Sequence, residues 1–186
     1  MFGSVKLKDL VLIPNLISLS RILLLPFAVY FLSIGDEGLW ECVILVSFIV
    51  FSDFLDGFLS RQLNQVSDLG KLLDPLADKI VIAGFSLGLV LYRDFPLWFF
   101  VFLVIRDLIL MGGGNWLYRA KGIVVMANFW GKATTVALAC VAFLYLFKDR
   151  VGYLPIIFIY LSMALSIVSL IVYTTESLAK IKGLRN

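Results

Sequence analysis

Four aspartates close together in the chain are the residues most able to do chemistry. They form two pairs, Asp53 with Asp56 and Asp74 with Asp78. At about 100° per residue, each pair falls on one face of its predicted helix. An aspartate inside a membrane helix costs about 2.5–3.5 kcal/mol, so four together require compensation. A divalent cation provides it, and a ligand set made only of oxygens selects a hard ion, Mg²⁺ or Mn²⁺, with Ca²⁺ as a further candidate.

Glycines and an arginine next to these aspartates indicate a ligand that carries phosphate. Gly57 follows Asp56, and Gly70 opens the next predicted helix. Glycine inside a helix costs up to about 1 kcal/mol relative to alanine, but it lets a large group approach the backbone. Four carboxylates can hold two ions, which clamp the attacking and leaving oxygens of phosphoryl transfer, and Arg61 can bind phosphate through two hydrogen bonds. The alternative is that the aspartates form buried ion pairs and the glycines pack helix on helix.

The composition places these residues in a membrane. The chain has 186 residues, of which 61% are hydrophobic and 16% charged, whereas soluble domains are about 45–50% apolar and about 25% charged. It contains no histidine, which excludes histidine-based acid–base catalysis and histidine-ligated zinc. Its two cysteines lie inside apolar runs, so neither a disulfide scaffold nor a cysteine-based metal site is expected. The sequence therefore predicts an all-α polytopic membrane protein.

Six apolar stretches are long enough to span a bilayer, which takes about 20 residues each. A short interfacial helix is expected before them, over residues 3–12. The sequence shows no internal repeat and no long linker, so residues 1–186 are expected to form a single domain. The six predicted transmembrane helices lie near residues 14–34, 39–60, 70–92, 95–118, 130–148 and 153–175.

The basic residues predict the orientation of these helices. Ten fall on the side of the two termini and three on the opposite side, which places both termini in the cytoplasm by the positive-inside rule. Arg21, Lys79 and Arg106 are expected at membrane depth. The net charge of +3 is then a topology signal, and no nucleic acid is expected as a partner. The ten are Lys6, Lys8, Arg61, Lys71, Arg119, Lys121, Lys132, Lys180, Lys182 and Arg185, and the three are Arg93, Lys148 and Arg150.

The aspartate segment resembles the signature of the CDP-alcohol phosphatidyltransferase family, D-x2-D-G-x2-A-R-x8-G-x3-D-x3-D. Every fixed position matches except Ser60, where the family usually has alanine. The resemblance implies a six-helix membrane enzyme, and a homodimer. It implies that the hydroxyl of an alcohol attacks the phosphorus bearing diacylglycerol in CDP-diacylglycerol and that CMP leaves. The site would face the cytoplasm, with the bacterial inner membrane as the expected location.

The resemblance also implies roles for individual residues. Two Mg²⁺ or Mn²⁺ ions are implied, the first held by Asp53, Asp56 and Asp74 and the second shared by Asp78. Asp78 is also the implied general base, which takes the proton of the attacking hydroxyl. The residues implied to bind the CDP group are Asp56, Gly57, Ser60, Arg61 and Gly70.

Outside the signature, three segments are similar to the phosphatidylglycerophosphate synthase and cardiolipin synthase branch of the family. They are residues 14–26, 105–107 and 129–135. This similarity favours glycerol 3-phosphate as the acceptor, with phosphatidylglycerol as the alternative and inositol phosphate or serine as further options. The chain departs from the synthase pattern at Asp107, where these enzymes often carry glutamate.

A phosphorylated acceptor needs cations to bind it. The candidates are Lys79, Arg106, Arg119 and Lys132. Arg106 could instead form an ion pair with Asp107, and Lys132 could extend to the lipid headgroups. Arg21 could pair with the carboxylate cluster, so it is left out of the acceptor set.

Two other classes of membrane protein also use intramembrane carboxylates. Intramembrane prenyltransferases hold a pyrophosphate through Mg²⁺, but they resemble longer chains with two separated aspartate-rich motifs. A divalent-cation carrier would be expected to carry acidic groups on several helices. Here all four aspartates lie on two adjacent predicted helices, with glycine and arginine beside them. The sequence therefore favours the phosphatidyltransferase over both.

Overall fold

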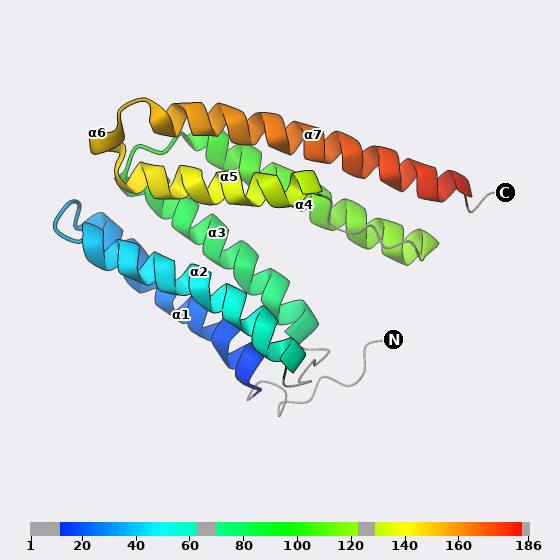
Figure 1. Cartoon of the computed structure of the whole chain (residues 1–186), viewed down its shortest axis with the longest axis horizontal. Coiled ribbons are helices and arrows are strands. Elements are labelled where there is room, and N and C mark those ends of the chain that lie inside the picture. The colour runs from blue at the N-terminus through cyan, green and yellow to red at the C-terminus, as the bar shows by residue number, and fades with distance from the viewer. Residues whose placement is uncertain (1–11, 63–69, 123–128, 184–186) are drawn as a thin grey trace. The chain divides into compact units, whose positions relative to one another are not determined.

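The computed structural model describes residues 12–62, 70–122 and 129–183, and this part of the chain consists of helices joined by short turns (Figure 1). The predicted all-α class is confirmed, and the long helices follow the six predicted spans. The chain divides into two compact units, Met1–Asp94 and Phe95–Asn186. The helices are α1 (Ile13–Ser33), α2 (Leu39–Gln62), α3 (Gly70–Tyr92), α4 (Leu97–Lys121), α5 (Phe129–Leu146), α6 (Lys148–Val151) and α7 (Leu154–Gly183).

Within the residues that the structure describes, four helices are long and apolar enough to cross a membrane on length and composition, which confirms a polytopic membrane protein. In α2, the described apolar segment is Leu39–Ser52, and the side chains that follow it in the helix lie outside the described residues. The second half of the signature lies in the first turns of α3. That α2 and α3 also span the bilayer stays a prediction. The four segments are Asn15–Ser33, Leu97–Ala120, Phe129–Leu146 and Leu154–Ile181.

Two helices extend beyond the predicted transmembrane spans, both at the expected cytoplasmic side. The helix α4 continues to Lys121 and α7 to Gly183, whereas their predicted spans end at residues 118 and 175. A helix need not stop where the hydrocarbon ends, because long basic side chains extend readily into water. Arg119, predicted in a loop, therefore lies in the last turn of α4. The interfacial helix predicted over residues 3–12 lies almost wholly outside the described residues.

In the first unit, α1 packs against both α2 and α3. The contact between α1 and α3, which we name the α1–α3 seam, is tied at each end by an arginine–aspartate pair. Arg21 of α1 pairs with Asp78 of α3, and Arg93 after α3 pairs with Asp36 after α1. Both pairs join residues 57 positions apart. Because the separation is the same at both levels, α1 and α3 run parallel and in constant register.

Two glycines of α3 let the helices of the seam approach closely between these pairs. A Cβ added at Gly84 would lie 2.6 Å from Leu25 Cδ2, and one added at Gly88 would lie 3.2 Å from Val29 Cγ2. Small residues four apart on one helix face permit this kind of packing inside membranes. The seam therefore consists of an ion pair, two glycine contacts and a second ion pair, in that order along α3.

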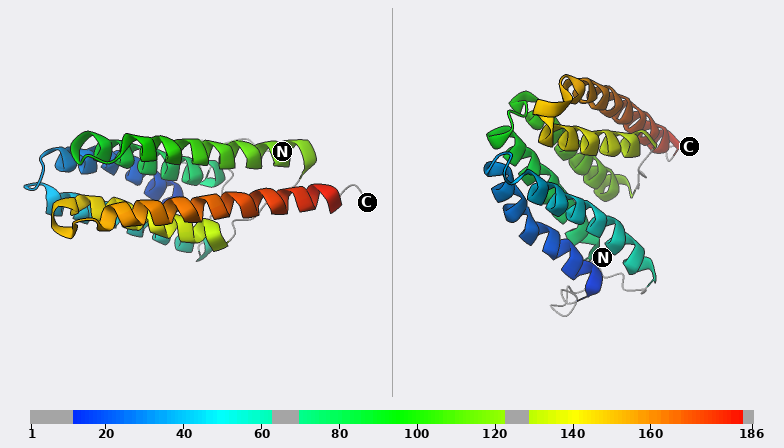
Figure 2. Two further views of the ribbon diagram at one scale, coloured as in Figure 1. Left: turned by 90° about the horizontal axis from the view of Figure 1, so that it is seen from above. Right: turned by 60° about the vertical axis from the view of Figure 1, so that its left-hand side comes forward.

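In the second unit, α7 packs along α5 and also contacts α4 and α6 (Figure 2). Its core includes an aromatic contact between Phe95 and Tyr145, whose ring centroids lie 4.8 Å apart in a T-shaped arrangement. The adjoining Phe99 is fully buried. On α7, buried serines recur at helical spacing and mark the face turned toward the other helices of the unit: Ser162, Ser166, Ser169 and Ser177.

Candidate functional site

The signature occupies the end of α2 and the beginning of α3, as predicted. Asp53, Asp56, Gly57, Ser60 and Arg61 lie in the last turns of α2, and their side chains lie outside the described residues. Gly70 is the first residue of α3 and is buried, and Asp74 lies one turn later with its side chain also outside the description. The helical placement of both aspartate pairs is thus confirmed, whereas the mutual geometry of the four carboxylates stays a prediction.

Asp78 is the signature aspartate whose side chain the structure describes. Its Oδ1 accepts a hydrogen bond from Nη1 of Arg21 at 2.6 Å, and its side chain is 38% exposed. The Arg21 side chain is only 2% exposed. Hydrogen bonds between two charged groups are shorter and stronger than neutral ones, so this contact compensates a guanidinium buried in an apolar helix. The expectation that Arg21 pairs with the carboxylate cluster is confirmed.

A polar face of α1 accompanies Arg21 into this contact. Asn15, Ser18 and Arg21 recur every three residues, and each is nearly fully buried. Nη2 of Arg21 donates to Oγ of Ser18 at 3.4 Å. The helix α1 therefore brings polar groups to the carboxylate end of α3, although none of its residues belongs to the signature.

The donor chemistry of this region fits a divalent cation. All four candidate ligands are carboxylates, and hard ions such as Mg²⁺ and Mn²⁺ prefer oxygen ligands. Within the described residues the structure contains no group of three or more ligand-type side chains, because the other three aspartates of the signature lie outside that description. Asp78 offers a partly exposed carboxylate, as a ligand or a base at a solvent-reachable site must.

Two of the proposed acceptor-binding cations, Arg106 and Arg119, lie far apart on the same helix. Arg119 follows Arg106 on α4 by 13 residues, which is about 20 Å along the helix and about 140° around it. Arg119 and Lys132 are exposed near helix ends, and Lys79 is half-buried beside Asp78. One phosphate group cannot be bound by Arg106 and Arg119 together, because these arginines lie at different levels and on different faces.

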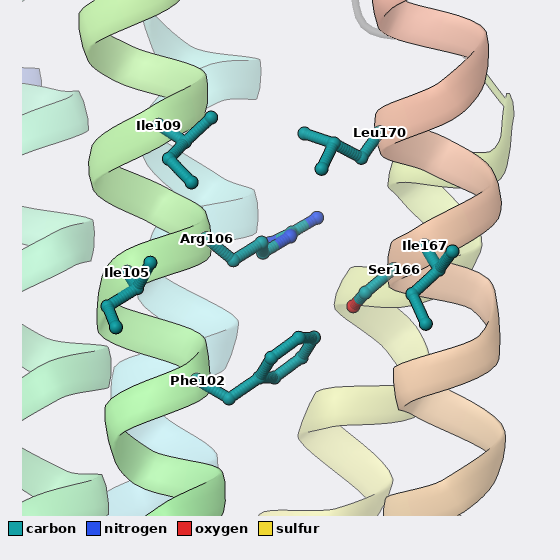
Figure 3. Close-up of a pocket in the computed structure, with 7 residues that line it drawn as sticks. All are labelled: Phe102, Ile105, Arg106, Ile109, Ser166, Ile167 and Leu170. Atoms are coloured by element: carbon teal, nitrogen blue, oxygen red, sulfur yellow. The ribbon is translucent and has the colours of Figure 1, made fainter.

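Arg106 lines a cavity of about 130 Å³ within the second unit. Its Nη1 donates to Oδ1 of Asp107 at 2.9 Å, so the ion pair considered as the alternative to acceptor binding is present. Figure 3 shows Arg106 projecting from α4 toward α7, and Ser166 pointing from α7 into the same space. Nε of Arg106 and Oγ of Ser166 are buried and have no hydrogen-bond partner in the described part of the chain. The lining residues are Phe102, Ile105, Arg106, Ile109, Ser166, Ile167 and Leu170.

The sequence interpretation missed three residues that these contacts single out. Gly84 and Gly88 were not recognised, although two glycines four apart in an apolar helix are a known signal for close helix packing. Ser166 was also missed, although serines at helical spacing in α7 could have marked a buried face. On α4, a Cβ added at Gly114 would lie 3.1 Å from the Tyr173 hydroxyl of α7.

Comparison with known proteins gives one family and several named relatives. A family model described as CDP-alcohol phosphatidyltransferase matches residues 11–169. A CDP-diacylglycerol–glycerol-3-phosphate 3-phosphatidyltransferase of Aquifex aeolicus is 41% identical over 127 residues, which cover 67% of this chain and 69% of the relative. An enzyme of the same name from Mycoplasma pneumoniae is 35% identical over 147 residues, covering 72% of this chain and 64% of the relative. A cardiolipin synthase (CMP-forming) of Streptomyces coelicolor is 34% identical over 147 residues, covering 76% and 68%.

Proposed function

Because the chain belongs to the CDP-alcohol phosphatidyltransferase family, we propose that it transfers the phosphatidyl group of CDP-diacylglycerol to glycerol 3-phosphate. The observation that carries the choice of acceptor is that relatives 41% and 35% identical are named for this reaction. The aligned segment covers 69% of the first relative and 64% of the second. The product would be phosphatidylglycerophosphate, with release of CMP.

The proposed reaction is a displacement at phosphorus. The acceptor hydroxyl oxygen forms a bond to the phosphorus that bears diacylglycerol, and the bond from that phosphorus to the CMP oxygen breaks. CMP leaves with the electron pair, and the carboxylate of Asp78 takes the hydroxyl proton. A positioned base of this kind contributes about 10²- to 10⁴-fold to a rate. What supports Asp78 in this role is its place in the signature and its partly exposed carboxylate.

The remaining signature residues are proposed to bind the nucleotide and the cations. Mg²⁺ or Mn²⁺ held by Asp53, Asp56, Asp74 and Asp78 would supply the positive charge that neutralises the pyrophosphate. The family is divalent-cation dependent. Asp56, Gly57, Ser60, Arg61 and Gly70 are proposed to receive the CDP group, with Arg61 on its phosphates and the two glycines admitting it close to the backbone.

The acceptor phosphate is proposed to bind to cations among Lys79, Arg106, Arg119 and Lys132. Arg106 and Arg119 cannot bind the same phosphate. Changing each arginine in turn therefore shows which of them, if either, binds the phosphate of the acceptor. The arginine that binds glycerol 3-phosphate should, when changed to glutamine, raise the KM for that acceptor and leave the KM for CDP-diacylglycerol unchanged. If neither Arg106→Gln nor Arg119→Gln raises the acceptor KM, both residues leave the acceptor set.

The protein is an integral membrane protein on the evidence of its apolar helices. We propose that both termini and the signature face the cytoplasm, that the membrane is the bacterial inner membrane, and that residues 1–186 act as one domain, with the homodimer as the proposed assembly. The excess of basic residues on one side supports the orientation. Labelling of single cysteines, placed either among residues 63–69 or at Glu37, tests it in intact cells: a reagent that cannot cross the membrane should modify position 37 only.

A panel of acceptors tests the proposed reaction. Purified protein with Mg²⁺ or Mn²⁺ should release CMP from CDP-diacylglycerol when glycerol 3-phosphate is added, and chelation by EDTA should stop the release. Phosphatidylglycerol, serine and inositol phosphate are compared in the same assay. CMP release with phosphatidylglycerol alone would establish the alternative, a cardiolipin synthase, which the Streptomyces coelicolor relative supports. A protein that moves divalent cations across vesicle membranes but releases no CMP would instead be a carrier.

A further inference from the structure

Arg21 is the largest fully buried side chain in the described part of the molecule, and its partner is the proposed base. We propose that Arg21 is a positioning residue, which holds the Asp78 carboxylate in the orientation that phosphatidyl transfer requires. This proposal rests on the proposed function, because that function assigns the base role to Asp78. Arg21 lies on α1, 32 positions before the first aspartate of the signature.

The seam supplies the first argument, because it does not need Arg21 to hold α1 against α3. The glycine contacts at Gly84 and Gly88 already bring the two helices together, and the Arg93–Asp36 pair ties their far ends. Replacing a buried ion pair by apolar residues of similar volume is often neutral or stabilising in proteins. Packing of α1 against α3 therefore does not require an ion pair at positions 21 and 78, since apolar residues at both positions would serve it as well.

The second argument comes from how firmly Arg21 itself is held. Its side chain is 2% exposed, and its two terminal nitrogens contact different groups, Nη1 reaching Asp78 and Nη2 reaching Ser18 Oγ. A guanidinium is planar and presents its donors in a fixed fork. A donor so constrained restricts rotation of the carboxylate that it binds, and that carboxylate is the more exposed member of the pair, at 38%.

The consequence for catalysis follows from how steeply rates depend on placement. A misplacement of about 1 Å in a reacting group can cost about 100-fold in rate. Without Arg21, the Asp78 carboxylate would keep its chemistry and lose the contact to its Oδ1. The loss should then appear in kcat, with the binding of the two substrates little changed.

Kinetics of two matched variants test this. Arg21→Gln should lower kcat about 100-fold while both KM values change by less than about threefold. Arg93→Gln removes the other buried guanidinium of the seam, and its folded fraction should keep the kcat of the unmodified protein. Thermal unfolding in detergent measures the folded fraction of each. Arg21→Lys keeps the positive charge but loses the planar arrangement of guanidinium donors. Its kcat should therefore lie between those of Arg21→Gln and the unmodified protein.

A double variant asks whether Arg21 acts through Asp78. In protein that carries Asp78→Glu, where the carboxylate has already moved, adding Arg21→Gln should reduce the residual kcat by less than about threefold. A full 100-fold loss in that background would overturn the proposal. Equal losses of kcat in Arg21→Gln and Arg93→Gln would do so too, because they would show a structural role alone.

The proposed function fails separately from this inference. If the unmodified protein releases no CMP with any acceptor, the assigned reaction is wrong. If it is active and Arg21→Gln retains its kcat, only the positioning role is wrong. Should Arg21→Gln not fold, Arg21→Lys alone decides, since an unchanged kcat in that folded variant contradicts the need for a planar fork.

Discussion

The two ends of the α1–α3 seam carry the same pair of residue types in different surroundings. At one end Arg21 binds Asp78 of the signature, whose side chain is 38% exposed. At the other end, about 22 Å farther along α3, Arg93 binds Asp36 in the turn after α1, and the Asp36 side chain is 68% exposed. Both guanidinium groups are almost fully buried. A buried arginine paired with an aspartate thus does not by itself mark a reaction site; the two ends differ because only Asp78 belongs to the signature.

The largest difference between the ends should appear when the two aspartates are changed in turn. Asp78→Asn removes the proposed base and keeps an oxygen that can accept from Arg21, so CMP release should fall about 10³-fold with little loss of stability. Asp36→Asn is the matched control, and it should release CMP at the rate of the unmodified protein. CMP release and thermal unfolding in detergent measure both. Full activity in Asp78→Asn would erase the difference between the ends.

A backbone change should disturb only the Asp36 end. Gly38 is buried, and a Cβ added there would collide with the backbone carbonyl oxygen of Phe31. Because a backbone atom cannot move aside cheaply, Gly38→Ala should lower the free energy of unfolding by about 1–3 kcal/mol. Unfolding by SDS in mixed micelles measures it.

Gly112→Ala provides the control for that substitution. An added Cβ at Gly112 of α4 meets nothing within 4 Å, and alanine favours a helix over glycine by up to about 1 kcal/mol. Its stability should therefore stay unchanged or rise slightly. If Gly38→Ala behaved in the same way, the turn after α1 would be more adaptable than its packing indicates.

Removing Asp36 should have a smaller effect than the collision at Gly38. Asp36→Ala leaves the Arg93 guanidinium without its aspartate partner, but Asp36 itself is mostly exposed and its charge is screened by water. The expected loss is about 1–2 kcal/mol in the free energy of unfolding, with kcat of the folded protein unchanged. A fall in kcat of the folded protein would show that the far end of the seam also affects the site.

The smallest effects are expected in the middle of the seam. The Cβ of Gly84→Ala would come too close to one terminal methyl of Leu25, which can rotate away, so the loss in the free energy of unfolding should be under about 1 kcal/mol. Gly88→Ala meets Val29, whose branched side chain has little rotamer freedom, and should cost more. Unfolding in mixed micelles ranks the two. The reverse order would show that Leu25 is held more tightly than its chain chemistry implies.

The fold was largely predictable from the sequence, because apolar length alone places the long helices. The helix ends near Lys121 and Gly183 were not, since hydropathy reports where the hydrocarbon stops and not where the backbone stops being helical. Within the site, the spacing of the signature predicts which helices carry the aspartates. It could not predict that Arg21 selects Asp78, because that contact depends on the parallel register of α1 and α3.

The distance between Arg106 and Arg119 along their helix could have been calculated from their residue numbers, but the sequence interpretation overlooked it. Thirteen residues on one helix put Arg106 and Arg119 at different levels, whatever the packing around them. The cavity beside Arg106 could not be foreseen, since it depends on α7 placing Ser166 opposite α4.

The equal spacing of the two arginine–aspartate pairs limits how this protein can change length. One extra residue in α1 between Arg21 and Asp36 would shift that helix by about 1.5 Å and turn it by about 100° relative to α3. One of the two arginine–aspartate pairs would then be lost. Adaptation to a thicker or thinner bilayer should therefore proceed by paired insertions or deletions in both helices, or by changes outside the segment that the pairs enclose.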